Sequence, residues 1–215
     1  MPRLLRLPSL RPAVGRALPL GLLLLAGAGC SSTQSLQSDP VSAPITLDGS
    51  DTEWVGSIQP VTDQPGLGVG VRNDGEALYV VAVLRNESQV RQALRSGLTL
   101  WLDPAGGTDR ALGVRFPLGA PTDRGAPAGD GRGRGDLPQP SASSPGDLEV
   151  LQNGAEAGAR QPANGASGIQ ASATLQGSVL VVEYRVPLAD GPFALGVLPG
   201  TPVGLGLTTP EVQRP

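Results

Sequence analysis

The chain has 215 residues, of which 31 are Gly and 22 are Pro, and it contains no His, one Cys and one Met. So many turn-forming residues exclude a helical bundle and favour short strands joined by turns. The lack of His and of a second Cys excludes zinc sites made of imidazoles or several thiolates, disulfides within the chain, and Ser or Cys nucleophiles activated by His.

The charge is distributed unevenly along the chain. All 16 basic residues are Arg, and four of them precede Cys30, where there is no acidic residue. Because all 19 acidic residues follow, the chain from Cys30 onward has a formal charge of −7. An acidic body argues against a nucleic-acid partner, which requires a basic face.

Residues 1–29 have the pattern of a secretory signal peptide. A basic segment precedes an apolar run over 17–29, which is too short for a permanent membrane-spanning helix but typical of a signal-peptide core. Cys30 follows directly, before a segment rich in Ser and Gln, and this arrangement resembles a bacterial lipoprotein signal. The resemblance implies that Cys30 becomes the first mature residue and carries lipid. The alternative is ordinary cleavage after Ala28, which would give a soluble secreted product.

We therefore expect an exported protein that is anchored by lipid to the cell envelope, and to the outer membrane where the cell has one. Residues 30–44 are polar and predict a flexible tether between this anchor and the folded domain. Residues 209–215 are expected to form a C-terminal tail.

The domain between them, residues 45–208, shows short apolar stretches with period-two alternation, interrupted by Gly, Pro, Asn and Asp. This pattern predicts an all-β domain in which antiparallel strands form two facing sheets. Hairpins are predicted at Asn73-Asp74-Gly75 and at Gln176-Gly177. The predicted strands are 45–47, 54–61, 67–73, 77–85, 98–103, 111–117, 148–152, 169–176, 178–186, 193–198 and 201–208.

One short helix of about two turns is predicted between the fourth and fifth of these strands. Ser88 is its expected N-cap, Val90 and Leu94 lie four apart on one face, and Gly97 ends it.

Two segments of the domain are too poor in large apolar residues to predict ordered structure. Residues 119–147 contain one large aliphatic side chain, Leu137, and predict a long disordered loop. Residues 153–168 are similar but shorter.

Four motifs, in this order along the chain, resemble carbohydrate-binding module family 9 and the related DOMON-like sandwiches. They are ITLDGSDTEW over Ile45–Trp54, Asn73-Asp74 followed by Leu78-Tyr79-Val80, LWLDP over Leu100–Pro104, and EYRVPL over Glu183–Leu188. The resemblance covers about residues 45–208. It implies a jelly-roll-like antiparallel β-sandwich, bound calcium in some members, and exposed Trp residues beside the sugar in members that bind carbohydrate.

Trp101 is the aromatic residue of greatest interest for binding. Period-two alternation places Leu98, Leu100 and Leu102 on one sheet face, and Trp101 and Asp103 on the other. If the leucines face the core, Trp101 lies on an outer face, where Trp101 and Asp103 are candidate ligand-binding residues; packing beneath a loop or helix is the alternative. Packing roles are expected for the remaining strand and motif aromatics Trp54, Tyr79 and Tyr184.

Three acidic residues near the first predicted strand, Asp48, Asp51 and Glu53, are candidate calcium ligands. Carboxylate and backbone carbonyl oxygens are the ligands that Ca²⁺ takes in proteins. Their spacing is not that of an EF-hand, and the alternative is a solvated turn at Asp48-Gly49. No other cofactor is predicted.

Paired carboxylates are the only common catalytic groups left, and 19 acidic residues always allow some pair, so the chain carries no specific catalytic signal. We expect a non-catalytic, lipid-anchored cell-envelope protein that binds or scaffolds a ligand which the sequence does not identify; a glycan and an envelope protein are candidate partners. One alternative is a carbohydrate-binding lipoprotein that uses an exposed Trp101. A carboxylate-dependent hydrolase is another.

Overall fold

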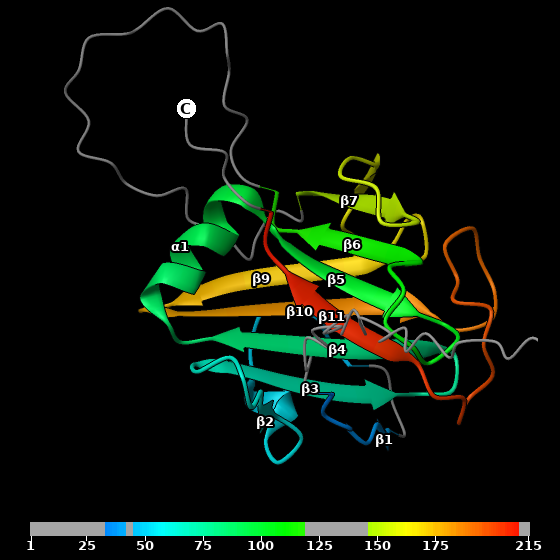
Figure 1. The fold of residues 1–215 in the computed structure, drawn as a ribbon, viewed down its shortest axis with the longest axis horizontal. Helices are drawn as coiled ribbons and strands as arrows, with labels where there is room; N and C mark the ends of the chain where they lie inside the picture. The colour runs from blue at the N-terminus through cyan, green and yellow to red at the C-terminus, as the bar shows by residue number, and fades with distance from the viewer. Residues whose placement is uncertain (1–32, 42–44, 119–145, 211–215) are drawn as a thin grey trace, which may run out of the picture. The chain divides into compact units, whose positions relative to one another are not determined.

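A computed structural model describes residues 33–41, 45–118 and 146–210, and in it two β-sheets face each other (Figure 1). The first sheet has the strand order β1-β3-β4-β10-β9, and β2 also pairs with β3. The second sheet has the order β11-β5-β6-β7-β8. The predicted all-β sandwich is therefore confirmed, while the jelly-roll connection pattern stays a prediction.

The strands of the first sheet are β1 (Asp39–Pro40), β2 (Gln59–Pro60), β3 (Leu67–Asn73), β4 (Ala77–Leu84), β9 (Gln170–Gln176) and β10 (Val179–Pro187). Those of the second are β5 (Leu98–Asp103), β6 (Leu112–Phe116), β7 (Asp147–Gln152), β8 (Ala159–Pro162) and β11 (Gly204–Thr208). The structure also has the helix α1 (Glu87–Ser96) and the 3-10 helix η1 (Thr52–Trp54).

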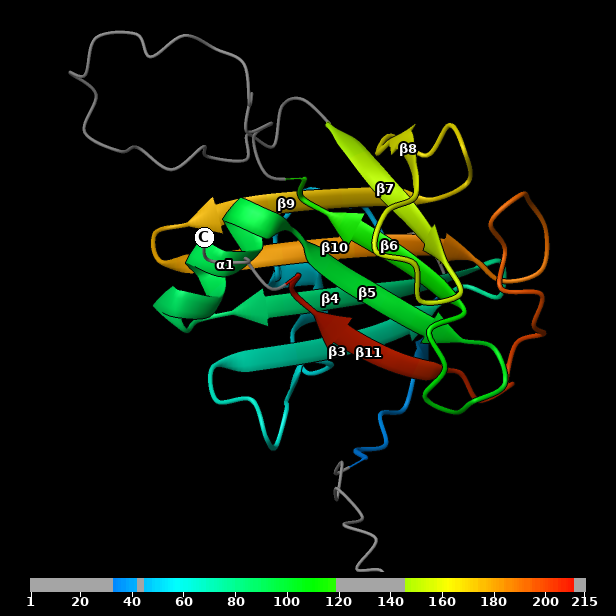
Figure 2. The ribbon, with the colours of Figure 1, turned by 45° about the horizontal axis from the view of Figure 1, so that its top comes forward.

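The main core lies between the two sheets and is built from alternate residues of the facing strands. Leu98, Leu100 and Leu102 of β5 point into it, as the period-two pattern predicted. The helix α1 closes one end of the sandwich, beside β4 and β10 (Figure 2). Its side chains Val90 and Leu94 are buried in the main core.

A second apolar cluster covers the opposite face of the first sheet. Trp54, Ile45, Leu47 and Ile58 pack there against outward-facing side chains of β4 and β10. The predictions of strands over 45–47 and 54–61 are wrong apart from β2, because the apolar side chains of this segment pack onto the face of the sheet while its backbone forms η1 and turns.

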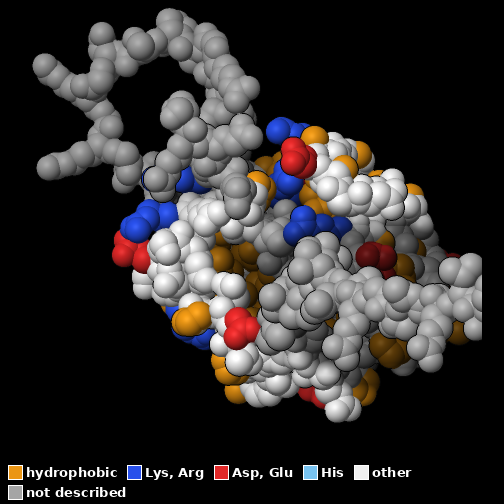
Figure 3. Space-filling model, in the orientation of Figure 1, with side chains coloured by type: hydrophobic (Ala, Val, Ile, Leu, Met, Phe, Trp, Pro, Cys, Tyr) orange, Lys and Arg blue, Asp and Glu red, His pale blue; other side chains and the backbone are white. Residues whose placement is uncertain are grey.

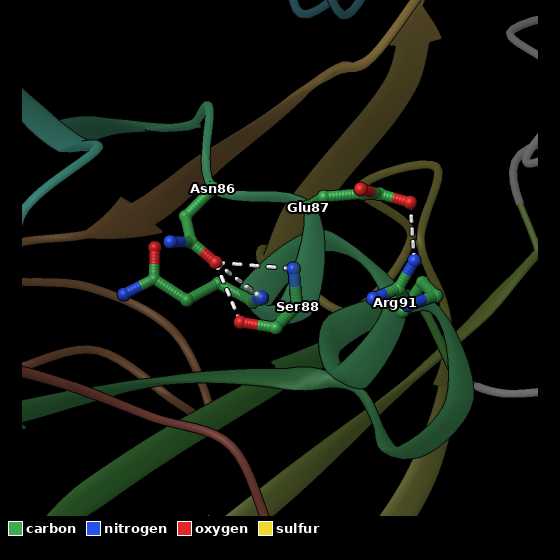
Figure 4. A network of polar contacts seen from close by, with 5 residues as sticks. Asn86, Glu87, Ser88 and Arg91 are labelled. Atoms are coloured by element: carbon green, nitrogen blue, oxygen red, sulfur yellow. Dashed lines mark hydrogen bonds and ion pairs between the residues drawn. The ribbon is translucent and has the colours of Figure 1, made fainter.

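The helix α1 begins two residues earlier than predicted. The side-chain oxygen of Asn86 accepts hydrogen bonds from the backbone N–H groups of Ser88 and Gln89, at 3.0 and 3.3 Å (Figure 4). Asn86 is therefore the N-cap, and the predicted cap Ser88 lies inside the first turn. The predicted C-terminal end is confirmed, because Gly97 has a φ of 86° and its N–H bonds the carbonyl of Ala93.

Part of the predicted tether lies on the sandwich. Within residues 33–41, β1 pairs with β3 in parallel, and the Asn73 amide donates to the Ser38 hydroxyl at 2.8 Å. Leu36 packs against the main core. This segment satisfies backbone groups at the edge of β3 that would otherwise be unpaired. Cys30 lies outside the described residues.

Residues 153–168 are more ordered than their composition predicted. They contain β8, which pairs with β7, and the fully buried side chain of Ala163. Residues 193–198, in contrast, form no strand, although Leu195 and Val197 are buried in the core. Of the predicted loop 119–147, all but the last two residues lie outside the described part of the chain.

None of the helices in the described residues has both the length and the hydropathy needed to span a membrane.

Candidate functional site

Trp101 lies on the outer face of the second sheet, opposite the leucines of β5. Its partners on the two neighbouring strands are both glycines, Gly113 on β6 and Gly206 on β11. A Cβ atom on Gly113 would lie 2.5 Å from Cζ3 of Trp101, so the indole lies closely over the backbone of β6. The glycine at this position thus provides the space that the ring occupies.

The indole is covered on this outer face. The guanidinium carbon of Arg110 lies over the ring, 5.5 Å from its centroid, which is a cation–π contact. The indole Nε1 donates a hydrogen bond to the Thr208 hydroxyl at 2.9 Å. Only 6 % of Trp101 is exposed. A sugar ring could therefore stack on Trp101 only after the Arg110 side chain moved away.

Asp103, at the end of β5, organises the turn that carries Arg110. Its two carboxylate oxygens accept hydrogen bonds from the backbone N–H groups of Ala105 and Asp109, at 2.9 and 3.0 Å. These bonds lower the pKa of Asp103 below its ordinary value. The structure thus brings Trp101 and Asp103 together, with Asp103 placing the loop that covers the ring.

A pocket of about 190 Å³ adjoins the edge of Trp101. Indole, carboxylate, guanidinium and hydroxyl groups meet in it, and its lining includes Trp101, Asp103, Thr108, Asp109, Arg110 and Thr208. This volume is smaller than the roughly 300 Å³ at which small-molecule sites commonly begin. The pocket can hold a small polar group such as part of one sugar ring.

The three candidate calcium ligands are not assembled into a metal site. Within the described ranges, no group of three or more Asp, Glu, Cys or His side chains is placed to hold a metal ion. The Asp48 carboxylate instead accepts from the N–H of Ser50 at 2.8 Å, and the Asp51 carbonyl accepts from the N–H of Trp54. Asp48 and Asp51 therefore shape the turn that leads into η1, and Glu53 lies within η1 itself.

Glu183 of β10, the first residue of the EYRVPL motif, is a buried carboxylate that was not among the predicted site residues. Its Oε1 accepts from the indole Nε1 of Trp54 at 2.8 Å, and its Oε2 from the backbone N–H of Gly49 at 2.6 Å. Burial raises its pKa to about 7, and the charges of Asp48 and Glu53 add to this effect, while the two hydrogen bonds oppose it.

A carboxylate with a raised pKa is a common feature of active sites. Glu183, however, is fully buried and is absent from the linings of both pockets described in this section. Its hydrogen bonds connect two of the four motifs named above, ITLDGSDTEW over Ile45–Trp54 and EYRVPL over Glu183–Leu188. The co-occurrence of these motifs was the only signal in the sequence that could have indicated the contact.

A larger groove, of about 580 Å³, lies on the side of the sandwich where β3 of the first sheet and β11 of the second both contribute to its lining. Residues 33–38 and 198–205 form its walls, and inward-facing side chains such as Leu78 and Leu102 form its floor. None of the described residues that line this groove is charged. Its volume lies within the range of small-molecule sites.

No protein-family model and no curated protein matches this chain.

Proposed function

We propose that this protein is a non-catalytic component of the bacterial cell envelope, anchored by lipid on Cys30, whose sandwich binds or scaffolds a partner. The observation that carries the proposal is the position of Cys30. It is the only Cys of the chain, it directly follows the apolar run 17–29, and it lies three residues before Thr33, which lines the larger groove.

The chemistry of the two pockets supports a role without catalysis. The described lining of the groove holds no charged side chain that could act as acid or base. In the pocket beside Trp101, both carboxylate oxygens of Asp103 are bonded to backbone N–H groups, and its lowered pKa keeps it ionised. General acid–base catalysis requires a group with a pKa near the working pH that reaches the substrate.

The distribution of charge supports a partner other than nucleic acid. On the face shown in Figure 3, outside the grey atoms, basic side chains lie among acidic ones and do not form one uninterrupted patch. Arg115, for example, pairs with Glu149 at 2.7 Å on the second sheet. Binding to a phosphate backbone requires a concentrated basic surface.

Lipidation is tested by expressing the full chain in a bacterium that processes lipoproteins, with an alkyne-bearing fatty acid in the medium. We expect the fatty acid on the wild-type protein, membrane fractionation, and a mature N-terminus at a modified Cys30 by mass spectrometry. The Cys30→Ser variant should lose the label. An unlabelled wild-type protein whose N-terminus is an unmodified Gly29 would show the alternative cleavage and overturn the proposal.

A second function, carbohydrate binding, is favoured by one observation, the mixture of indole, carboxylate and guanidinium groups in the pocket beside Trp101. Sugars are bound by such combinations of an aromatic surface with a few placed polar groups. Screening against a saccharide panel tests it, followed by calorimetry. Arg110→Ala should alter the affinity of any hit, whereas Arg160→Ala, at an exposed position of β8, should not. Lack of any saccharide ligand removes this function.

A further inference from the structure

We propose that the side of the sandwich bearing the uncharged groove lies against the membrane, with Leu198 and the groove walls in contact with lipid. The occupant of this surface is thus a bilayer of uncharged or zwitterionic lipid. The inference rests on the proposed lipidation of Cys30, and it adds which surface of the domain faces the membrane.

The first argument is the short distance between the anchor and this surface. Thr33 already lines the groove. The next residue, Gln34, is held to the fold, because its amide donates to the Pro60 carbonyl at 3.1 Å and accepts from the Thr62 N–H at 3.2 Å. Cys30 lies three residues before Thr33, and three residues span at most about 11 Å. A lipid on Cys30 therefore keeps the groove side close to the bilayer.

The second argument is the chemistry of the surface that this short connection brings to the membrane. Leu198 lines the groove and is 72 % exposed; among the described residues, the only other exposed large hydrophobic side chain is Val55. The loop that follows Leu198 has the uncharged sequence Pro-Gly-Thr-Pro-Val. Apolar side chains at a membrane surface are stabilised by burial at the boundary between headgroups and acyl chains.

The third argument is what the groove disfavours. A charged ligand would have to leave water for a surface whose described residues offer no opposite charge, which is unfavourable. A membrane surface of neutral lipid carries no net charge and avoids this cost. A neutral peptide would also avoid it, and the experiment below separates the two.

The experiment places an environment-sensitive fluorophore at the groove. In the lipidated full-length protein the sulfur of Cys30 is a thioether, so the Leu198→Cys variant has a single free thiol. It is labelled with a nitrobenzoxadiazole probe and reconstituted into phosphatidylcholine vesicles. We expect a blue shift of the emission and loss of intensity when nitroxide-labelled lipids are included. The matched control is Ser178→Cys, at an exposed position of the β9–β10 hairpin, on the edge of the first sheet opposite to β1.

Each outcome has a defined meaning. A shift and quenching at the Leu198→Cys position alone support the inference. If the probe there behaves as it does at the Ser178→Cys position while mass spectrometry shows lipid on Cys30, the membrane contact is overturned and the lipid anchor stands. A shift that requires an added peptide and is insensitive to nitroxide lipids also overturns it. An unlipidated Cys30 overturns both proposals.

Discussion

The indole Nε1 of Trp54 donates a 2.8 Å hydrogen bond to Oε1 of Glu183, a residue 129 positions further along the chain. The second carboxylate oxygen of Glu183 accepts from the backbone N–H of Gly49. Since Trp54 and Gly49 belong to the segment that covers the outer face of the first sheet, one buried carboxylate holds this segment on the sandwich at two points.

Replacing Glu183 by Ala should lower the free energy of unfolding by about 3 kcal/mol, because two buried donors lose their acceptor. Urea denaturation of the purified protein measures this loss. Glu76→Ala, at an exposed position, is the control and should change the stability by no more than about 0.5 kcal/mol. Equal stabilities of the two variants would show that the contact contributes little.

The stability should depend on pH through Glu183. Its pKa is about 7 in the folded protein, against an ordinary value of 4.5. Between these values the folded state binds more protons than the unfolded state, so stability is greatest below the window and falls as pH rises through it. The fall should be at most about 3 kcal/mol.

Chemical denaturation at intervals from pH 4.5 to 8 measures this fall, and the Glu183→Gln variant should lack it. Asp74 and Asp103 have lowered pKa values, so each stabilises the folded state above its unfolded-state pKa. This stabilisation is lost as the pH falls, which is the opposite direction to the effect of Glu183. A wild-type stability that rises between pH 4.5 and 7 would contradict the assignment.

Because Trp101 packs tightly against β6, we expect alanine substitutions at its two glycine neighbours to lower the stability by different amounts. Gly113→Ala would place a Cβ 2.5 Å from the indole and should destabilise the protein by about 1–3 kcal/mol. Gly206→Ala meets the Cβ of Trp101 only at 3.8 Å and should have a much smaller effect. Thermal unfolding of both variants, followed by Trp fluorescence, checks the comparison; equal losses would mean that the indole does not press on β6.

The N-cap of α1 is tested by a pair of alanine variants. Asn86→Ala removes the acceptor of two backbone N–H groups and should cost about 1 kcal/mol of stability. Ser88→Ala removes a hydroxyl that donates to Asn86 at 2.6 Å and caps no backbone group, so its effect should be smaller. Denaturation curves that reverse this order would identify Ser88 as the cap.

Local patterns were sufficient wherever one face of a strand is buried and the other is distinct. The alternation of Leu98, Leu100 and Leu102 correctly predicted both β5 and the outward position of Trp101. Apolar runs bounded by turn residues predicted β3, β4 and β10 closely, although all of β4 is buried and shows no alternation. It failed for β1 and β8, since two and four residues are too few to show a period.

Two features on which the proposed function rests could be read from the sequence alone: the apolar run that ends directly before Cys30, and the lack of His and of a second Cys. Both depend on which residues are present and in what order. Tertiary structure alone decided that Arg110 covers Trp101, that Glu183 bonds Trp54, and that residues 33–38 and 198–205 border one uncharged groove. Glu183 and Trp54, like the two walls of the groove, are more than a hundred positions apart in the chain and meet only when the sandwich folds. Arg110 is close to Trp101 in the chain, but its place over the ring depends on the fold of the turn that Asp103 holds. No local periodicity encodes either kind of contact.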